Sequence, residues 1–585
     1  MPNEASTAVA TPDSATSPPP HFDLTRRPWI PVLRTDGVET ELSLIEVFEQ
    51  AAQVRRLVGD LPTQDFALLR LLLAILHDAI DGPRSIEDWG ELWDDGLPLE
   101  ETRAYLDTHR ERFDLLHPDT PFMQVSGLRT AKGEYSALDR IVADVPNGAR
   151  FFTMRADGAR RLDHGEAARW LVHAHAYDLS GIKSGAEGDP RVKGGRGYPQ
   201  GVGWAGHLGG VYAEGDDLRQ TLLLNLIAFD TKNFDTDAGP EPDRPAWVHP
   251  PATAAPLSGA AAGSRPYGVR DLYTWQTRRV RLQHDAEGVH GVLLAYGDPL
   301  SPRNMQLREP MSAWRRSPAQ EKKLREATVY LPRDHDPARA AWRGLGALVT
   351  GRVRGGDQRQ EAAEYVRPRI VDWIARLTVH RYLPRGHLLR VRLAGAVYGT
   401  QQSVVDEIVD DSVAMPMILL HQEHEELARE AVDAVTDAED AVTALGDLAT
   451  GLAQAAGADG DGPRGTARDR GFGELDEPFR DWLRRLAQGG GEDTGTGLPL
   501  DDPRYPREQR RTWQFTVRSI VSRLADELIA SASEASWEGR VLETKSGAFW
   551  LNTSSVDLRF RRALRTALPL TIPDTDSDNG TEEQQ

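Results

Sequence analysis

The 585-residue sequence contains no cysteine, which excludes disulfide bonds and thiolate metal sites. No apolar run is long enough for a transmembrane helix. The N-terminal segment lacks the basic and apolar parts of a signal peptide. Its Ser, Thr, Pro and Ala content predicts a disordered leader over residues 1–20. Together, these absences favour a protein of the cytoplasm.

Sequence signatures of catalysis are also missing. The chain has no H-E-x-x-H, G-x-S-x-G, P-loop, kinase or deaminase motif. His173 and His175 would point about 200° apart on a helix, so one metal could not easily take both. His421, Glu423 and His424 could share a helix face and bind a metal, but a solvated acidic face is the preferred interpretation. We therefore predict a protein that is not an enzyme and that has no cofactor.

The formal net charge of −20 argues against a protein that coats nucleic acid over its whole surface. Local basic patches remain possible, since salt screens the interaction between charges more than about 10 Å apart. Three clusters of cations are candidates, although each is individually more typical of a solvated face. They are Arg265, Arg270, Arg278, Arg279 and Arg281; Arg303, Arg308, Arg315, Arg316, Lys322, Lys323 and Arg325; and Arg352, Arg354 and Arg359.

Up to residue 404 the pattern predicts a mixed α/β domain of residues 21–404. A first strand is expected within residues 22–32, and helical spacing of apolar residues predicts helices over 42–51, 65–80 and 166–178. Residues 268–285 and 288–298 have the pattern of strands around a turn. The regular β-α alternation of a doubly wound fold is absent.

Beyond residue 405 the pattern becomes helical. It predicts a helix of about forty residues over 415–457, a linker over 457–471, and further helices over 477–488, 507–534 and 555–568. Helices separated by glycine-rich linkers predict a four-helix bundle of residues 405–570, followed by a disordered acidic tail of residues 571–585. The expected fold class is therefore α+β, with a large mixed N-terminal domain and a C-terminal bundle.

Eleven glycines lie between Gly181 and Gly210, interleaved with Lys183, Arg191, Lys193 and Arg196. Glycine allows positive φ and close approach of the backbone to a partner. Cations beside such a backbone are typical of sites that bind phosphate groups. A surface loop without a ligand is the alternative, and composition alone does not separate the two.

Three further segments contain candidate contact residues. The prolines of residues 117–125 (HPDTPFMQV) predict a turn in which Phe122 and Met123 are a buried anchor. Aromatics followed by arginines in residues 151–161 could stack on bases and hold phosphates, or form a strand end and surface turn. The glutamines of residues 398–403 (YGTQQS) are typical of a polar loop, or of side chains that enter a DNA groove.

In this order, the pieces resemble the CasA family, the large subunit of the type I-E CRISPR surveillance complex Cascade. The resemblance rests on residues 23–32 (DLTRRPWIPV), HPDTPFMQ, the glycine-rich stretch before DLRQTLLLNLI, PAWVHP before GVRDLYTWQ, and YGTQQS. It covers about residues 22 to 565. The family implies a mixed α/β domain of unusual topology with a C-terminal four-helix bundle, as expected above.

The resemblance also implies a function without catalysis. Such subunits recognise the protospacer-adjacent motif (PAM) in double-stranded target DNA, start strand separation, and dock the helicase–nuclease. Their partners are the other Cascade subunits and the CRISPR RNA (crRNA). The residues implied for DNA and PAM binding are Lys193, Gly194, Gly195, Arg196, Gly197, Gln401, Gln402 and Ser403. Those implied for the loop at the crRNA 5′ end and the backbone subunit are Phe152, Arg155, Arg160 and Arg161.

The sequence departs from the family at two places. The lysine that reaches a PAM base has no clear counterpart; Arg303 is a candidate by position, and Lys193 could compensate. The cysteine-rich segment of some members is absent, consistent with a metal-free version. Two alternatives remain open: a scaffold subunit that does not touch DNA, and a metal-dependent nuclease or hydrolase that uses the histidines near residue 421.

Overall fold

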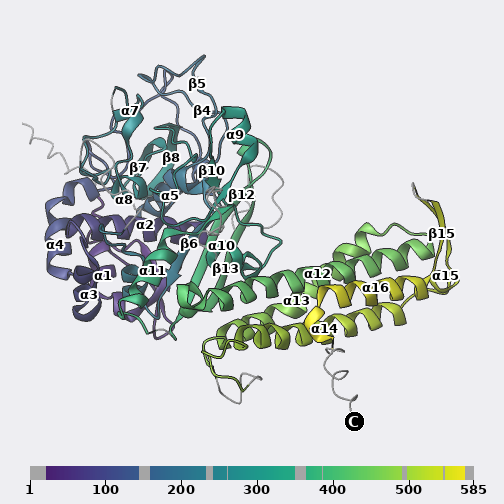
Figure 1. Cartoon of the computed structure of the whole chain (residues 1–585). Helices are drawn as coiled ribbons and strands as arrows, with labels where there is room; N and C mark the ends of the chain where they lie inside the picture. The colour runs from purple at the N-terminus through teal and green to yellow at the C-terminus, as the bar shows by residue number, and fades with distance from the viewer. Residues whose placement is uncertain are drawn as a thin grey trace, which may run out of the picture.

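The computed structural model describes residues 21–143, 159–231, 242–259, 261–349, 364–384, 386–489, 497–544 and 547–572. A body of short helices and small sheets carries a long helical bundle that projects from one side (Figure 1). This arrangement confirms the predicted fold class, with a mixed N-terminal part and a C-terminal four-helix bundle.

Every strand pairing between the named strands of the described chain is antiparallel, as expected for a fold that is not doubly wound. The strands of the body form small sheets. In sheet order these are β2 (Glu39–Leu42), β1 (Ile30–Arg34) and β3 (Val54–Leu57); β10 (Tyr330–Pro332), β9 (Trp314–Arg316) and β11 (Tyr365–Val366); β13 (Val405–Pro416), β12 (Leu388–Tyr398) and β6 (Gly210–Glu214); β7 (Arg278–Asp285) with β8 (Gly288–Tyr296); and β4 (Lys183–Ser184) with β5 (Arg196–Gly197).

Helix α2 (Pro62–Ala79) lies in the core of the body. It is apolar on nearly all sides, which is the pattern of a helix surrounded by protein, and Phe66 and the leucines and isoleucine of residues 68–76 are buried. Pro62 occupies its first turn, where no intrahelical N–H bond is lost. Further helices complete the body. They are α1 (Leu44–Glu49), α3 (Ile86–Asp95), α4 (Leu99–Thr108), α5 (His164–Tyr177), α6 (Leu218–Asn225), α7 (Ala261–Ser264), α8 (Val269–Tyr273), α9 (Pro318–Leu324), α10 (Leu345–Val349) and α11 (Arg369–Val379). Of these, helices α4, α5, α6 and α8 pack against α2.

The bundle is built around α12 (Glu425–Ala456), a 32-residue helix about 48 Å long. It packs against α13 (Asp461–Arg485), α14 (Tyr505–Ala530) and α16 (Thr553–Ala567). Its buried face consists largely of alanine, which lets these helices approach closely. The short helix α15 (Glu534–Glu538) and the hairpin of β14 (Arg540–Thr544) and β15 (Gly547–Leu551) close the far end (Figure 1).

Two expectations for the C-terminal part are wrong. The helix predicted from residue 415 begins only at Glu425, because β13 continues to Pro416 in register with β12 and short 3₁₀ turns follow. The linker predicted over 457–471 is mostly the first half of α13. Gly471 allows close packing of α13 on α12: a Cβ at this position would lie 3.1 Å from the Val442 side chain. In the N-terminal body, a third expectation is wrong: residues 268–273, predicted as part of a strand, contain the helix α8.

Body and bundle meet through aromatic and charged contacts. The Trp342 ring stacks on Phe479 with ring centroids 4.4 Å apart, and its indole N–H donates to Asp476 at 2.8 Å. Arg480 forms an ion pair with Asp411 of β13 at 3.1 Å. The domain boundary expected at residue 404 falls in the loop between β12 and β13, and these two strands pair with each other. That division of the chain stays a prediction.

Candidate nucleic-acid interface

Residues Lys193 to Arg196 form a tight two-residue turn at the end of a small hairpin. The Lys193 amide donates to the Arg196 carbonyl, and the Arg196 amide donates to the Lys193 carbonyl, both at 3.1 Å. Gly194 and Gly195 have φ values of 58° and 73°. Positive φ at both central positions is the requirement of a type I′ turn, and glycine meets it without steric cost. The two glycines therefore define the shape of this turn.

The turn is open to solvent. A Cβ built on Gly194 or Gly195 would meet no heavy atom within 4 Å. The side chains of Lys193 and Arg196 are exposed, and within the described residues neither forms an ion pair. The backbone and two cations of the turn are thus accessible to an anionic partner, whereas Gly197 is buried against the ring of Tyr296.

The base of the hairpin is held by a buried cluster of charges. Asp178 accepts from the Lys183 ammonium group at 2.8 Å and from the Arg278 guanidinium group. Arg278 also donates to the backbone carbonyls of Asp178 and Gly201 at 2.9 Å, and lies over the ring of Tyr296. Burial lowers the pKa of Lys183, against the opposing effect of Asp178. Lys183 is therefore a structural residue and not a surface cation.

Arg191 is also occupied by the protein itself. Its guanidinium group forms two bonds of 2.9 Å with Asp189 and donates to the carbonyls of Tyr296 and Gly297. Of the four cations in the glycine-rich stretch, Lys183 and Arg191 anchor the loop, and Lys193 and Arg196 are exposed. The sequence does not show which two cations are buried, because the burial of Lys183 depends on how the fold places Asp178, the residue that follows α5.

The Gln402 loop joins β12 to β13 and lies beside the start of the glycine hairpin. Gln401 and Gln402 have φ values of 57° and 55°, an uncommon conformation for residues other than glycine. The Gln402 carbonyl accepts from the Ser180 amide at 2.8 Å, and the Tyr398 hydroxyl donates to the Tyr177 carbonyl at 2.6 Å. The Gln401 side chain is exposed, and Gln402 and Ser403 are half-buried. The Gln402 loop is therefore in direct contact with the segment that leads into the glycine hairpin.

The segment expected at the crRNA 5′ end is described only in part. Phe152 and Arg155 lie outside the described residues. Arg161 forms a two-bond ion pair with Asp285 of β7, and the adjacent Leu162 exchanges backbone hydrogen bonds with Val289 of β8. Arg160 is exposed. This end of the segment is therefore anchored on the β7–β8 hairpin.

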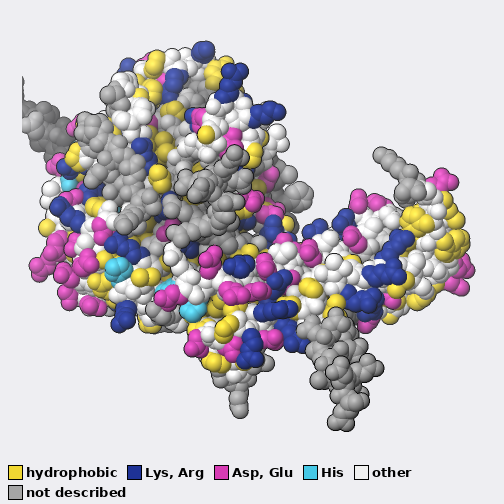
Figure 2. Space-filling view, in the orientation of Figure 1, with side chains coloured by type: hydrophobic (Ala, Val, Ile, Leu, Met, Phe, Trp, Pro, Cys, Tyr) yellow, Lys and Arg dark blue, Asp and Glu magenta, His cyan; other side chains and the backbone are white. Residues whose placement is uncertain are grey.

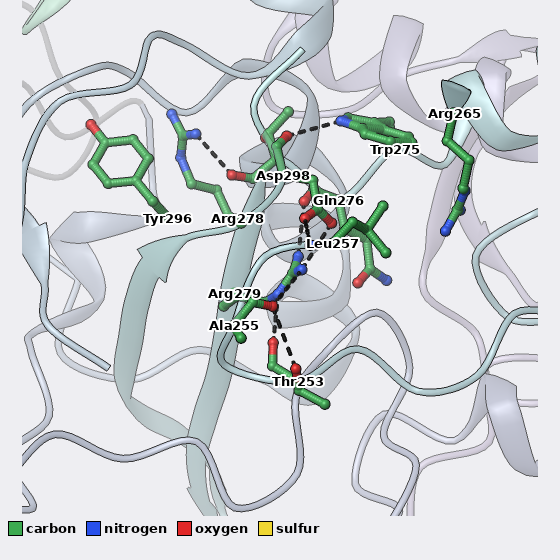
Figure 3. A network of polar contacts seen from close by, with 12 residues as sticks. Thr253, Ala255, Leu257, Arg265, Trp275, Gln276, Arg278, Arg279, Tyr296 and Asp298 are labelled. Carbon is green, nitrogen blue, oxygen red and sulfur yellow. Dashed lines mark hydrogen bonds and ion pairs between the residues drawn. The ribbon is translucent and has the colours of Figure 1, made fainter. Parts of the chain in front are cut away.

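The first predicted basic patch is wrong as a surface feature. Arg278 and Arg279 are each 2% exposed, and Arg270 is 6% exposed. Arg270 pairs with Asp78 at 2.9 Å. Arg279 pairs with Asp298 at 2.8 Å and donates to the carbonyls of Thr253 and Ala255 (Figure 3). Asp78 and Asp298 lie outside the arginine run, so the sequence of the run does not show that carboxylates neutralise its charges. The nearby cavity of about 330 Å³ is bordered by this network.

The second patch is divided between paired and exposed cations. Arg303 pairs with Glu326 at 3.3 Å and Arg316 pairs with Glu321 at 2.7 Å, whereas Lys322, Lys323 and Arg325 are exposed on and after α9. Figure 2 shows Lys and Arg side chains gathered at the end of the body that carries β4, β5 and α9, and acidic side chains at the edge near α3 and α4. The third patch lies outside the described residues.

Two of the histidines considered as metal ligands, His173 and His175, are buried and make polar contacts within the protein. His173 contacts the Thr63 hydroxyl at 2.9 Å, and His175 contacts the Met123 carbonyl at 2.8 Å. Burial lowers the pKa of each to about 4, so both are neutral at pH 7. His424 ends a 3₁₀ turn before α12, so the predicted shared helix face is wrong. In the described part of the chain, no three side chains of metal-binding type are grouped.

The predicted anchor of residues 117–125 is confirmed. Phe122 is 1% exposed and Met123 is 9% exposed, and Phe122 stacks on Phe113. The side chain of Gln124 donates to the Leu115 carbonyl at 2.8 Å and accepts from the Leu282 amide at 2.9 Å. This turn therefore connects the segment at Leu115, which follows α4, to β7. None of the helices that the structure describes is both long and apolar enough to cross a membrane.

The body carries a cationic glycine turn and a glutamine loop beside the start of its hairpin, and the helical bundle projects from one side of the body. The sequence profile of the family described as CRISPR-associated protein Cse1 matches residues 23–524, so the chain belongs to the Cse1 family. The crystal structure of Thermobifida fusca Cse1 has a similar fold with a TM-score of 0.85 and 58% sequence identity, over 94% of this chain and 99% of that chain.

Two other relatives extend the comparison. CasA/Cse1 of Thermus thermophilus is 32% identical over 301 residues, which are 50% of this chain and about half (55%) of the length of that relative. A chain of a solved CRISPR RNA-guided surveillance complex is 18% identical with a TM-score of 0.61, over 88% of this chain and 100% of that chain. At this identity, the last similarity concerns the fold alone.

Proposed function

We propose that this chain is the large subunit of a type I-E CRISPR surveillance complex and is not itself an enzyme. In this role it recognises the PAM in duplex DNA, initiates strand separation for R-loop formation, and helps to recruit the helicase–nuclease. The observation that carries the proposal is the hydrogen bond between the Ser180 amide and the Gln402 carbonyl. It holds the glycine hairpin and the glutamine loop on one surface of the body.

The glycine turn is the part that faces the PAM. Without Cβ atoms its backbone can enter the minor groove, where base pairs differ mainly as A·T or G·C. This chemistry supports a relaxed PAM preference. Lys193 and Arg196 flank the turn and bind phosphates on either side of it, while Gln401, Gln402 and Ser403 meet the duplex beyond the PAM.

Gln402 acts as a wedge. Separating one base step costs roughly a few kcal/mol. Pairing of the guide then exchanges a DNA duplex for an RNA–DNA hybrid at nearly equal stability, so modest protein contacts determine the outcome.

The segment with Phe152, Arg155, Arg160 and Arg161 is assigned to the crRNA 5′ end and the backbone subunit. The nucleic-acid contacts are assigned to the body within residues 21–404, and α12, α13, α14 and α16 form the bundle.

The first test uses the crRNA complex of the other subunits, reconstituted with and without this chain, and duplexes that differ only in the PAM. We expect Gln402→Ala to weaken binding of the PAM-containing duplex about tenfold. Because Gln402 has a positive φ, Gln402→Gly preserves the loop conformation and should show the same loss. Gln488→Ala, an exposed glutamine after α13, is the control and should bind normally.

Equal affinity for both PAMs with the wild-type chain would remove the DNA-reading role and leave a scaffold subunit. The metal-dependent enzyme would be favoured instead if alanine substitution of His421 and His424 removed both a bound divalent metal and a hydrolytic activity.

The salt dependence of binding tests the phosphate contacts. Lys193→Ala and Arg196→Ala should each reduce the slope of log K against log salt concentration by about one, since each removes one cation from the polyanion. Binding isotherms at several salt concentrations measure this slope. Lys322→Ala on α9 is a matched exposed cation of the same end of the body. An unchanged slope for Lys193→Ala and Arg196→Ala would show that their side chains do not meet phosphates.

A further inference from the structure

Two apolar side chains lie on the outward face of the glycine hairpin. Lys183 is paired with Gly197 across the hairpin, so Ile182 and Tyr198 flank the next register position. Side chains alternate between faces along each strand. Lys183 and Gly197 face the body, since Lys183 is buried and a Cβ on Gly197 would lie 3.3 Å from the Tyr296 ring. Ile182 and Tyr198 therefore face solvent, and they are 49% and 50% exposed.

The apolar pair lies between the two segments assigned to DNA. Ser180, which binds the Gln402 carbonyl, is two residues before Ile182. Arg196, which closes the glycine turn, is two residues before Tyr198. Two residues of extended chain span about 7 Å, the scale of one nucleotide step. Along the hairpin, the apolar pair therefore lies between Ser180, which contacts the glutamine loop, and Arg196, which closes the glycine turn.

The surroundings of the pair favour a polyanion. The acidic residues of the intervening loop are engaged by arginines: Glu187 accepts from Arg129 at 2.6 Å, and Asp189 accepts from Arg191 at 2.9 Å. Within the described residues the Tyr198 side chain makes no hydrogen bond and has no aromatic or cationic partner, and half of its surface is open to solvent. An aromatic ring left exposed beside cations is the combination that packs on nucleotides.

We propose that Ile182 and Tyr198 form an apolar contact for the deoxyribose groups of the target duplex, between the glycine turn and Gln402. This inference rests on the proposed function and adds a binding element to it. Sugars line the minor groove at every base pair, so the contact strengthens binding without reading sequence. It also supports the sugar–phosphate backbone at the step that Gln402 opens.

The test is the Tyr198→Ala variant of the full chain in the reconstituted crRNA complex. We expect about tenfold weaker binding of duplexes with either PAM, an unchanged ratio between the PAMs, and an unchanged salt slope. Tyr198→Phe should bind as the wild type does, because the hydroxyl has no partner. Ile182→Ser should weaken binding about threefold. Phe515→Ala, a 46% exposed aromatic on α14, is the control and should have no effect.

Three outcomes would overturn the inference. The first is normal binding by Tyr198→Ala while Gln402→Ala is weakened, in which case the proposed function stands without this contact. The second is a loss confined to one PAM, which would make Tyr198 a sequence-reading residue. The third is failure of Tyr198→Ala to join the complex on size-exclusion chromatography, which would place the pair in a protein interface. Absence of PAM dependence with the wild-type chain would contradict the proposed function itself.

Discussion

Replacement of Asp178 by alanine is expected to lower the free energy of unfolding by about 3–5 kcal/mol, because it leaves two buried cations without their carboxylate. The ammonium group of Lys183 and the guanidinium group of Arg278 are 3% and 2% exposed, and both contact this carboxylate. Water cannot replace the lost partner at that depth. Urea denaturation followed by tryptophan fluorescence measures the loss.

Two matched variants test this reason. Removing one of the stranded cations in Asp178→Ala/Lys183→Met should restore part of the stability, since only one buried charge then lacks a partner. Asp285→Ala breaks the exposed ion pair with Arg161 and should change the unfolding curve little. Equal stability of Asp178→Ala and the wild type would show that the cluster is not a structural anchor.

Gly195→Asp should weaken binding of the PAM-containing duplex about a hundredfold, ~2.7 kcal/mol, because it places a carboxylate where the turn faces a polyanion. The turn itself should persist. No heavy atom lies within 4 Å of the added Cβ, and aspartate tolerates a positive φ. Binding isotherms of the complex, together with a melting curve of the isolated chain, separate binding from folding.

The isosteric Gly195→Asn variant isolates the charge. Asparagine has the same shape and the same tolerance of positive φ, so it should bind more tightly than the aspartate variant and less tightly than the wild type. Gly37→Asp is the positional control: Gly37 has a φ of 87°, has open space around its Cβ, and lies in the turn between β1 and β2. Normal binding by Gly195→Asp would exclude close approach of the turn to DNA.

The sequence predicted some elements well because their signals are local. The apolar spacing of residues 65–80 and 166–178 corresponds to α2 and α5. It failed where a tertiary contact overrides propensity. The glycine-rich residues 457–471 have weak intrinsic helix propensity, but most of them are helical, and Gly460 and Gly471 lie close against Thr450 and Val442 of α12.

The arginine run of residues 265–281 failed for a different reason. Its charge density predicted a surface patch, but Asp78, Asp178 and Asp298 neutralise it inside the body. Ion pairs between distant segments leave no spacing pattern in the sequence. Tyr198 was missed in the same way, because its exposure depends on which face of the β4–β5 hairpin meets the body.

The α+β class and the helical character of the C-terminal part could be predicted from the sequence alone. Both follow from periodicity, which acts over a few residues. The exposure or burial of each cation, and the contact of the Gln402 loop with Ser180, could be established only from the folded structure. Those properties depend on contacts between residues far apart along the chain, and only the folded body brings these residues together.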